Sequence, residues 1–375
     1  MSLDRRQLIT GLAGAGMTTF ASETASAPRA LIESLTEVQQ NAGRIFLSRH
    51  STVDVHSHPG RFFIRDVVNP SPRLKAYGPP FEKRVSAEMR AGRVSAALFS
   101  AVADMSILEF SPERGMFAFR PFAAGEAWAD YRRQIATLKG MVESCMVERG
   151  ESVRDVHDAH HRVRTAAIFA VEGGDFIEDQ LDRIGIAYND GVRSITLVHY
   201  HVNQIGDIQT APAHHDRLTP IGRDIIREMN RIGIIVDLAH APMSVVRGAA
   251  DVSTRPMIMS HTNLSRRDFN HPRLVSPEKA RLVTNAGGVV GSVPSGIGQS
   301  TFAEWIDSIV RMIDMLGVDH VAIGTDMDAN FMPVFTSYLD WHMIPAALLA
   351  RRLAEAEVEK VMGGNFLRVF AANAD

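Results

Sequence analysis

Eight short segments rich in β-branched and apolar residues recur along the chain, separated by stretches with helical periodicity. Most are nearly continuous apolar runs, which is typical of parallel strands covered on both faces. In order they are TVDVH (52–56), VSAALFSAV (94–102), TAAIFAVEG (165–173), VRSITLVH (192–199), GIIVDLAH (233–240), PMIMSH (256–261), GGVVGSV (287–293) and HVAIGTD (320–326). This repetition predicts a (β/α)₈ TIM barrel of the α/β class. A doubly wound open sheet is the alternative, although no glycine-rich nucleotide-binding sequence follows the first strand.

Helix start signals between these segments support the repeat. Thr219 and Ser276 are each followed by proline, a residue favoured at the first helical position, and each has the side chain of a good N-cap. Thr301 and Glu304 have the spacing of a capping box ahead of another apolar-periodic stretch. We therefore expect helices to begin at these three points.

The composition permits a large globular fold and excludes several classes of function. The chain has 375 residues, of which 45% are hydrophobic, enough for one sizeable core. Its 40 basic and 43 acidic residues give a formal net charge of −3 without long runs of either sign, so we expect no nucleic-acid partner. The single cysteine, Cys145, excludes an intramolecular disulfide and a cysteine-rich metal site, and we expect it to be a small buried hydrophobe.

The first 27 residues have the pattern of an export signal. Arg5 and Arg6 precede a mildly apolar run over 8–21, and an Ala-Ser-Ala sequence at 25–27 supplies a cleavage-like site. The apolar run is short for a membrane span, so we expect no stable span. We predict a twin-arginine-type signal over 1–27, a single (β/α)₈ barrel domain over 28–375, and a periplasmic or secreted protein.

Side chains that can bind a metal ion lie at the C-terminal ends of the predicted strands. In chain order these residues are His56, His58, Glu172, His199, His240, His261 and Asp326. Barrel enzymes gather catalytic groups on that face, so residues far apart in sequence converge over one opening. Five other histidines lie before a strand or in a loop, where we expect solvated positions: His157, His160, His161, His214 and His215.

Imidazole nitrogen and carboxylate oxygen are good ligands for Zn²⁺, and the two oxygens of a carboxylate can bridge two ions. Glu172 is the bridging candidate for a pair of zinc ions, and no lysine lies at a predicted strand end to take that role. The alternative for Glu172 is that it caps the helix after VEGGD.

An ordered set of motifs resembles the membrane (renal-type) dipeptidases, the zinc peptidase family M19. The motifs are VEGGD, GVRSITLVHYHVN, LTPIGRDIIREMNRIGIIVDLAH, PMIMSHTN, HVAIGTDMD and GGNFLRVF, spread from about residue 53 to residue 370. The resemblance implies a (β/α)₈ barrel of the metal-dependent hydrolase type with two zinc ions. It places His56 and His58 on one ion and His240 and His261 on the other, with Glu172 bridging both.

Three positions depart from the family pattern. The family has His-x-Asp at the first strand, whereas this chain has His56 and His58, so the first metal lacks one negative charge. We expect this change to make bound water more acidic and to loosen retention of that ion. The family's Arg-Asn pair after the sixth strand is Arg273-Leu274 here, and its DFDG motif is DMDA, which retains Asp326.

The resemblance implies hydrolysis of the amide bond of dipeptides, including those with a C-terminal D-residue. In this mechanism Asp326 orients the nucleophile and carries its proton, and His199 contacts the substrate and donates to the carbonyl oxygen. Arg273 holds the free carboxylate of the dipeptide, with Arg266 and Arg267 as alternatives. A homodimer is a further expectation from the resemblance.

Two other functions fit the same residues. One is a related metal-dependent amidohydrolase that acts on an N-acyl amino acid, a lactone or a peptide natural product. The other is a non-catalytic barrel that binds peptide with one metal ion or none. Turnover of dipeptides and the zinc content of the purified protein separate the three hypotheses.

Overall fold

The computed structural model describes residues 35–68 and 70–374. The signal predicted over 1–27 lies outside this part of the chain and stays a prediction.

Within the described residues, eight parallel strands close into a barrel, which confirms the predicted fold. The strands are β1 (Val53–Ser57), β2 (Ala96–Val102), β6 (Ala166–Glu172), β7 (Val192–Thr196), β8 (Ile235–Asp237), β9 (Ile258–Thr262), β10 (Val289–Ser292) and β11 (Val321–Ile323). They pair in sequence order, and the β1–β11 and β2–β6 pairings complete the ring. Each strand coincides with one of the eight apolar segments, because a strand buried on both faces needs an apolar side chain at nearly every position.

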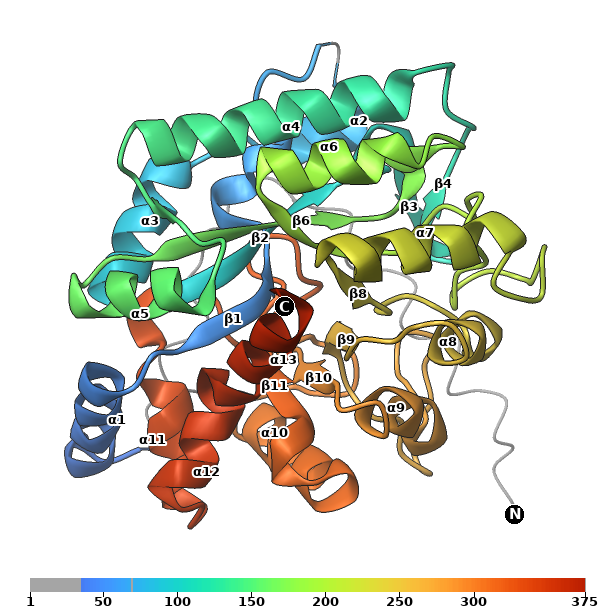
Figure 1. Cartoon of the computed structure of the whole chain (residues 1–375). Helices are drawn as coiled ribbons and strands as arrows, with labels where there is room; N and C mark the ends of the chain where they lie inside the picture. Colours follow the sequence, from blue (N-terminus) through green and yellow to red (C-terminus); the bar gives the residue numbers. More distant parts are fainter. Residues whose placement is uncertain (1–34, 69, 375) are drawn as a thin grey trace, which may run out of the picture.

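Helices surround the barrel (Figure 1). They are α1 (Glu37–Arg49), α2 (Pro72–Ala76), α3 (Glu82–Ala91), α4 (Glu126–Glu143), α5 (Val153–His161), α6 (Asp182–Asp190), α7 (Pro220–Ile232), α8 (Met243–Ala250), α9 (Pro277–Thr284), α10 (Phe302–Leu316), α11 (Met343–Ala350), α12 (Glu355–Glu359) and α13 (Asn365–Ala374). The predicted N-caps are confirmed: Thr219, Ser276 and Thr301 each accept a backbone hydrogen bond at the start of their helix. The capping box is incomplete, since the Glu304 carboxylate accepts from the backbone of Ser300 and not from that of Thr301.

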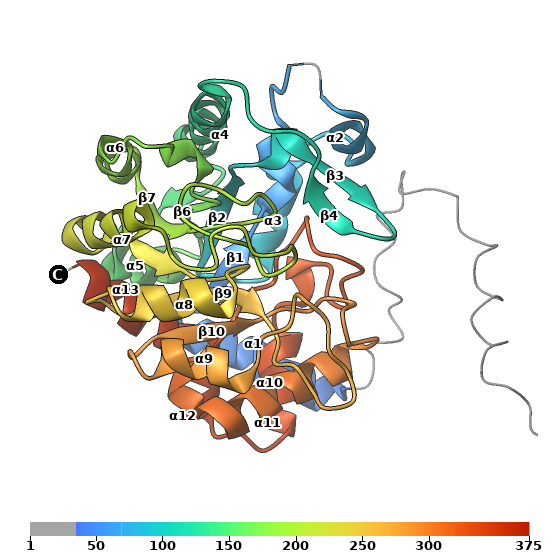
Figure 2. The ribbon, with the colours of Figure 1, turned by 90° about the vertical axis from the view of Figure 1, so that its right-hand side faces the viewer.

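The hydrophobic core has two main layers. One fills the barrel and includes Val55, Leu98 and Ile168, which pack against Phe366 and Phe370 of α13. The other lies between the strands and the surrounding helices. Figure 1 shows α13 across the near end of the barrel, and Figure 2 shows the C-terminus at the opposite end of the molecule from a β-hairpin. Because α13 closes the end at which the strands begin, the open end is the one at which they finish.

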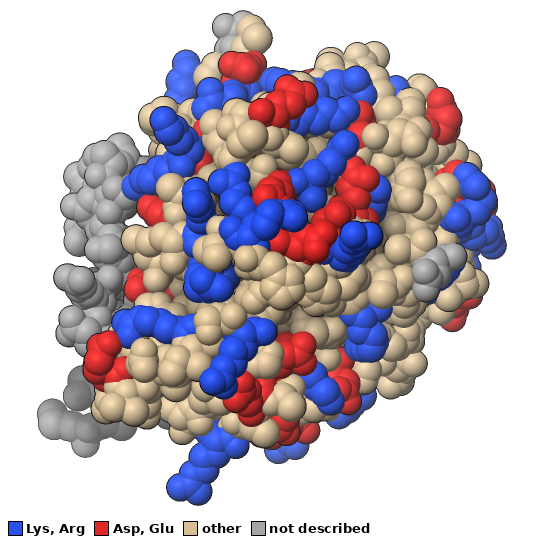
Figure 3. Space-filling model, turned by 60° about the vertical axis from the view of Figure 1, so that its left-hand side comes forward, with Lys and Arg blue, Asp and Glu red and all other residues tan. Residues whose placement is uncertain are grey.

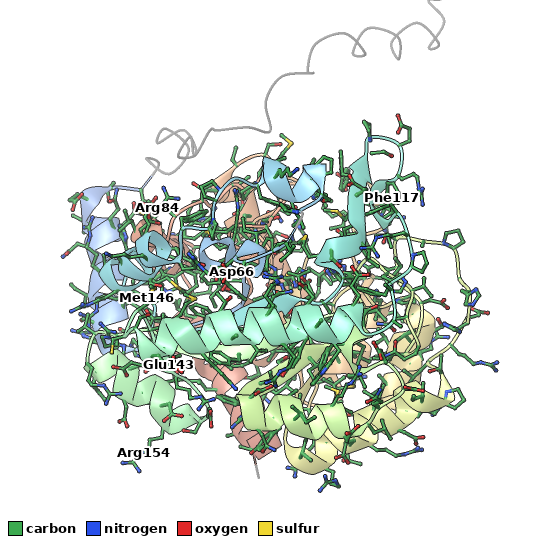
Figure 4. All side chains as sticks on the ribbon, turned by 90° about the horizontal axis from the view of Figure 1, so that it is seen from above. Asp66, Arg84, Phe117, Glu143, Met146 and Arg154 are labelled. Atoms are coloured by element: carbon green, nitrogen blue, oxygen red, sulfur yellow. The ribbon has the colours of Figure 1, made fainter. Side chains whose placement is uncertain are left out.

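The β2–β6 connection contains an insertion that the sequence pattern did not predict. It forms an antiparallel hairpin of β3 (Leu108–Ser111) and β4 (Gly115–Ala118), and a short strand β5 (Glu148–Arg149) that pairs with β6. Figure 4 shows Phe117 on the hairpin at one edge of the molecule and Glu143 at the far end of α4. Cys145 follows α4 with a positive φ of 57° and is exposed, so the expectation of a buried cysteine is wrong.

The surface carries charges of both signs. On the face in Figure 3, Lys and Arg side chains are interspersed with Asp and Glu side chains. None of the helices among the described residues combines the length and apolar character that a bilayer crossing requires.

Candidate metal centre

Two clusters of metal-binding side chains meet at the open end of the barrel. In the first, His56 Nε2 lies 3.2 Å from His58 Nε2 and 3.5 Å from Glu172 Oε1. The second oxygen of Glu172, Oε2, lies 3.4 Å from His58 Nε2. The β1–β2 pairing changes register between Asp54 and Ser57, and this irregularity lies where β1 delivers the two histidines.

The second cluster uses the same glutamate. His240 Nε2 lies 3.0 Å from His261 Nε2 and 3.0 Å from Glu172 Oε1, and His261 Nε2 lies 3.3 Å from that oxygen. All five side chains are buried. Glu172 therefore stands between two pairs of imidazoles, one pair from β1 and the other from β9 and the end of β8.

These spacings fit metal ions. Ligand atoms at about 2.0–2.1 Å from a tetrahedral Zn²⁺ lie roughly 3.3 Å apart, which is close to the separations in both clusters. The backbone supports a functional role, since His240 (φ 64°) and Asp326 (φ 53°) both occupy the left-handed region. Residues that are not glycine adopt this conformation at a cost that the surrounding structure must offset, and they concentrate at functional sites.

Outer hydrogen bonds hold three of the four rings, those of His56, His58 and His261, so that their Nε2 atoms face the site, whereas Nδ1 of His240 is buried without a partner. His58 donates through Nδ1 to the backbone oxygen of Ser100 at 2.7 Å. The Ser260 hydroxyl lies 3.2 Å from His56 Nδ1 and 3.0 Å from His261 Nδ1, and it donates to Asp237 at 2.6 Å. Such partners fix the tautomer and ring orientation of metal-ligating histidines.

The electrostatics favour a cation between these groups. Burial opposes ionisation of Glu172, but the surrounding histidines, led by His199 and His56, hold the pKa of its carboxyl well below its usual value. Burial, together with the positive charge of Arg273, keeps the pKa of His240 well below its usual value, so this ring is neutral as a ligand must be. His58 differs: burial opposes its charge, yet hydrogen bonds to Asp326 and Glu172 raise its pKa to about 10. A metal ion must therefore displace a proton from His58.

The two predicted catalytic side chains adjoin the clusters. Asp326 Oδ1 lies 3.3 Å from His58 Nε2, and the Asp326 side chain is partly exposed toward the opening. His199 Nε2 lies 3.4 Å from Glu172 Oε2, while its Nδ1 pairs with Asp104 Oδ1 at 2.6 Å. Asp104 is fully buried and also accepts from the backbone of Tyr200 at 3.0 Å. His199 is therefore held by Asp104 on one side and faces the clusters on the other.

Arg273 lies at the same opening. Its guanidinium carbon is 6.0 Å from the centre of the Tyr200 ring, and its Nη1 is buried without a hydrogen-bond partner. Of the two alternative arginines, Arg266 pairs with Asp268 at 3.3 Å and Arg267 is exposed. Arg273 is consequently the arginine that has a buried donor to offer a ligand.

Sequence reasoning missed the groups that support the ligands. Asp54 and Asp237 are carboxylates inside otherwise apolar strand segments, and that contrast was the available signal. Asp104 lies beyond the end of β2 and gave no such signal. Among the histidines expected to be solvated, His160 is buried, with Nδ1 3.0 Å from Ser95 Oγ, so that expectation is wrong for it.

A parallel eight-stranded barrel with two histidine–carboxylate clusters that could each hold a metal ion at its open end has the arrangement of a metal-dependent barrel enzyme. The sequence profile of the membrane dipeptidases, peptidase family M19, matches residues 80–375. The chain belongs to this family.

Two fungal relatives carry the name dipeptidase. Dipeptidase tcpJ of Claviceps purpurea (strain 20.1) is 32% identical over 254 residues, covering 64% of this chain and 59% of that protein. Dipeptidase verJ of Clonostachys rogersoniana is 30% identical over 225 residues, covering 57% of each. The chain thus spans less than two thirds of the length of either relative.

Solved structures share the fold. The probable dipeptidase PvdM from Pseudomonas aeruginosa superposes with a TM-score of 0.73 at 18% identity, covering 90% of this chain and 98% of that one. A metallopeptidase from Rhodobacter sphaeroides, liganded with a phosphinate mimic of the dipeptide L-Ala-D-Ala, gives a TM-score of 0.71 at 19% identity. That match covers 86% of this chain and 99% of the other.

Proposed function

We propose that this protein is a binuclear zinc dipeptidase whose substrates include dipeptides with a C-terminal D-residue. The observation that carries the proposal is the sharing of Glu172 between two buried histidine pairs, beside an arginine with an unpaired buried donor. The fungal relatives named dipeptidases support the substrate class. The L-Ala-D-Ala mimic held by the Rhodobacter sphaeroides protein supports the extension to D-residues.

The residues that would hold the ions follow from the two clusters. His56 and His58 would hold one zinc ion, His240 and His261 the other, and Glu172 both. When bound, zinc lowers the pKa of water toward ~7 and polarises a carbonyl group. Four neutral imidazoles and one shared carboxylate would neutralise only a small part of the positive charge of two zinc ions. The remaining charge would favour both the ionisation of water and the polarisation of a carbonyl group.

Asp326 handles the proton. Its carboxylate is beside the first cluster and partly open to solvent, so it accepts the proton of the attacking water and passes it to the leaving amine. His199 donates to the substrate carbonyl oxygen as negative charge develops there, and Asp104 fixes the ring for that task.

Arg273 selects for a free carboxylate. A bidentate pair with the C-terminal carboxylate would satisfy the buried Nη1 and place the amide bond over the clusters. A chain end held this close to the metals favours dipeptides over internal bonds of proteins.

The enzyme is proposed to act outside the cytoplasm. The support is the order of twin arginine, apolar run and Ala-Ser-Ala at the N-terminus. Replacement of Arg5 and Arg6 by lysine should retain the protein in the cytoplasmic fraction of a bacterial host with a twin-arginine export system. Export of the double variant at the rate of the unchanged protein would overturn this part.

One assay tests the proposed activity. Zinc-loaded protein is offered L-Ala-D-Ala, N-acetylated amino acids and lactones under identical conditions, and dipeptide hydrolysis is expected to exceed the other two. If dipeptides are untouched while N-acetylated amino acids or lactones turn over, the dipeptidase proposal falls. The variant Glu172→Gln, with similar shape but a neutral side chain, is the matched control and should lose activity on every substrate.

A further inference from the structure

A second buried cation, Lys279, lies close enough to Arg273 to be affected by its charge, and it has no role in the reaction described above. Lys279 is the third residue of α9, where the Ser276 hydroxyl caps its backbone N–H. Its side chain folds inward, and the residue is only 6% exposed. Its Nζ donates to Gln209 Oε1 at 2.6 Å, and Gln209 donates through its backbone to the carbonyl oxygen of His240 at 2.8 Å. Lys279 thus reaches the wall of the metal centre through one neighbour.

The groups around Lys279 are rich in hydrogen-bond donors that lack acceptors. Gln209 Nε2, Thr210 Oγ1 and Arg273 Nη1 are all buried without a hydrogen-bond partner. Among the described residues, no carboxylate lies within ion-pair distance of Lys279 or Arg273. Buried donors and cations are normally paired, and an unpaired one costs about 1–3 kcal/mol or more. We call Gln209, Thr210, Arg273 and Lys279 the anion pocket.

Burial and the nearby positive charge of Arg273 lower the pKa of Lys279 to about 7. An anion placed between the two side chains would offset both effects, because it favours the charged form of lysine. The anion pocket is therefore suited to bind a negatively charged group.

We propose that the anion pocket recognises a second carboxylate on the substrate, so that the preferred dipeptides end in aspartate or glutamate. This inference rests on the proposed function, in which Arg273 holds the C-terminal carboxylate. Lys279 and the amide of Gln209 would then contact the acidic side chain of the same residue. Lys279 is a specificity-determining residue in this view and takes no part in bond cleavage.

Matched substrates test the inference. Initial rates are measured for L-Ala-D-Glu, its neutral analogue L-Ala-D-Gln and L-Ala-D-Ala, with the unchanged protein and with Lys279→Met, which keeps an unbranched side chain of similar length. We expect the unchanged protein to favour the Glu substrate over the Gln substrate by about tenfold or more in kcat/KM, as for a charge-assisted contact. Lys279→Met should lose that preference, because its kcat/KM for L-Ala-D-Glu should fall about tenfold further than its kcat/KM for L-Ala-D-Ala. Lys279→Arg, which keeps the positive charge, should retain part of the preference for the Glu substrate.

Equal kcat/KM values for the Glu and Gln substrates in the unchanged protein would overturn the inference while leaving the dipeptidase proposal intact. A preference that survives in Lys279→Met would overturn it as well. If no dipeptide is hydrolysed, the dipeptidase proposal fails, and calorimetric binding of N-acetylglutamate against N-acetylglutamine decides the pocket separately. Tighter binding of N-acetylglutamate than of N-acetylglutamine that is lost in Lys279→Met would support the anion pocket. Equal binding of the two compounds, or a difference that persists in Lys279→Met, would refute it. Should Lys279→Met fail to fold, Lys279→Gln replaces it.

Discussion

The role of Arg273 gives the prediction that can be worked out most fully. Its Nη1 is buried without a partner, so a substrate carboxylate would supply the missing acceptor. A hydrogen bond to a charged group contributes about 1.5–3 kcal/mol, and a bidentate pair makes two such bonds while losing part of the gain to desolvation. We therefore expect Arg273→Met to cost about 3 kcal/mol of transition-state stabilisation, which is roughly 150-fold in kcat/KM.

The assay compares a dipeptide with its C-terminal amide. L-Ala-D-Ala should show the full loss in Arg273→Met, whereas L-Ala-D-alaninamide has no carboxylate and should change by less than about threefold. The control is Arg266→Met, because Arg266 pairs with Asp268 and should leave both substrates unaffected. Equal losses on the dipeptide and the amide would refute the reasoning, since they would show that Arg273 supports the site and does not bind the carboxylate.

Three further predictions concern the groups around the clusters. Asp104→Asn removes the charged acceptor of His199 Nδ1 and should lower kcat by about 100-fold with little change in KM. An unchanged kcat would contradict the role of Asp104 in positioning His199. Between pH 7 and 10.5 the unfolded chain carries a proton on Lys279 that the folded protein lacks, because burial and Arg273 lower its pKa to about 7. The free energy of unfolding of the unchanged protein should therefore rise with pH relative to that of Lys279→Met, by at most about 1.4 kcal/mol per pH unit. Urea titrations of both proteins at pH 7, 8 and 9 measure the difference, and a difference that stays constant with pH would rule this out. Removal of metal with EDTA should lower Tm by about 5 °C or more, reversibly on adding zinc, because the ions bind the folded clusters only; an unchanged Tm would count against metal binding.

The fold could be predicted from sequence because its signal is local. A parallel strand covered on both faces needs a continuous apolar run, and the eight runs correspond to β1, β2 and β6 to β11. The topology then places every strand end at one opening, so His56, Glu172 and Asp326 could be grouped from the sequence alone. The β3–β4 hairpin was not predicted because insertions between the barrel strands do not carry continuous apolar runs.

Other features depend on packing between distant segments. Lys279 has the sequence context of an ordinary helix surface, but the fold buries it and brings its Nζ to Gln209, a residue 70 positions away. Asp104 meets His199 because β2 and β7 bring their following loops together, a contact between residues 95 positions apart. Cys145 lies directly after α4 at a residue with positive φ and is exposed, a position that its apolar sequence neighbours did not indicate.

The metal content of the purified protein tests the central claim most directly. Elemental analysis after zinc reconstitution and removal of free metal should give about two zinc ions per chain, since two clusters each offer three ligands. Glu172→Gln, which removes the shared carboxylate, should hold clearly less than two. No zinc in the reconstituted protein, or a full two ions retained in Glu172→Gln, would contradict the account of a bridged pair.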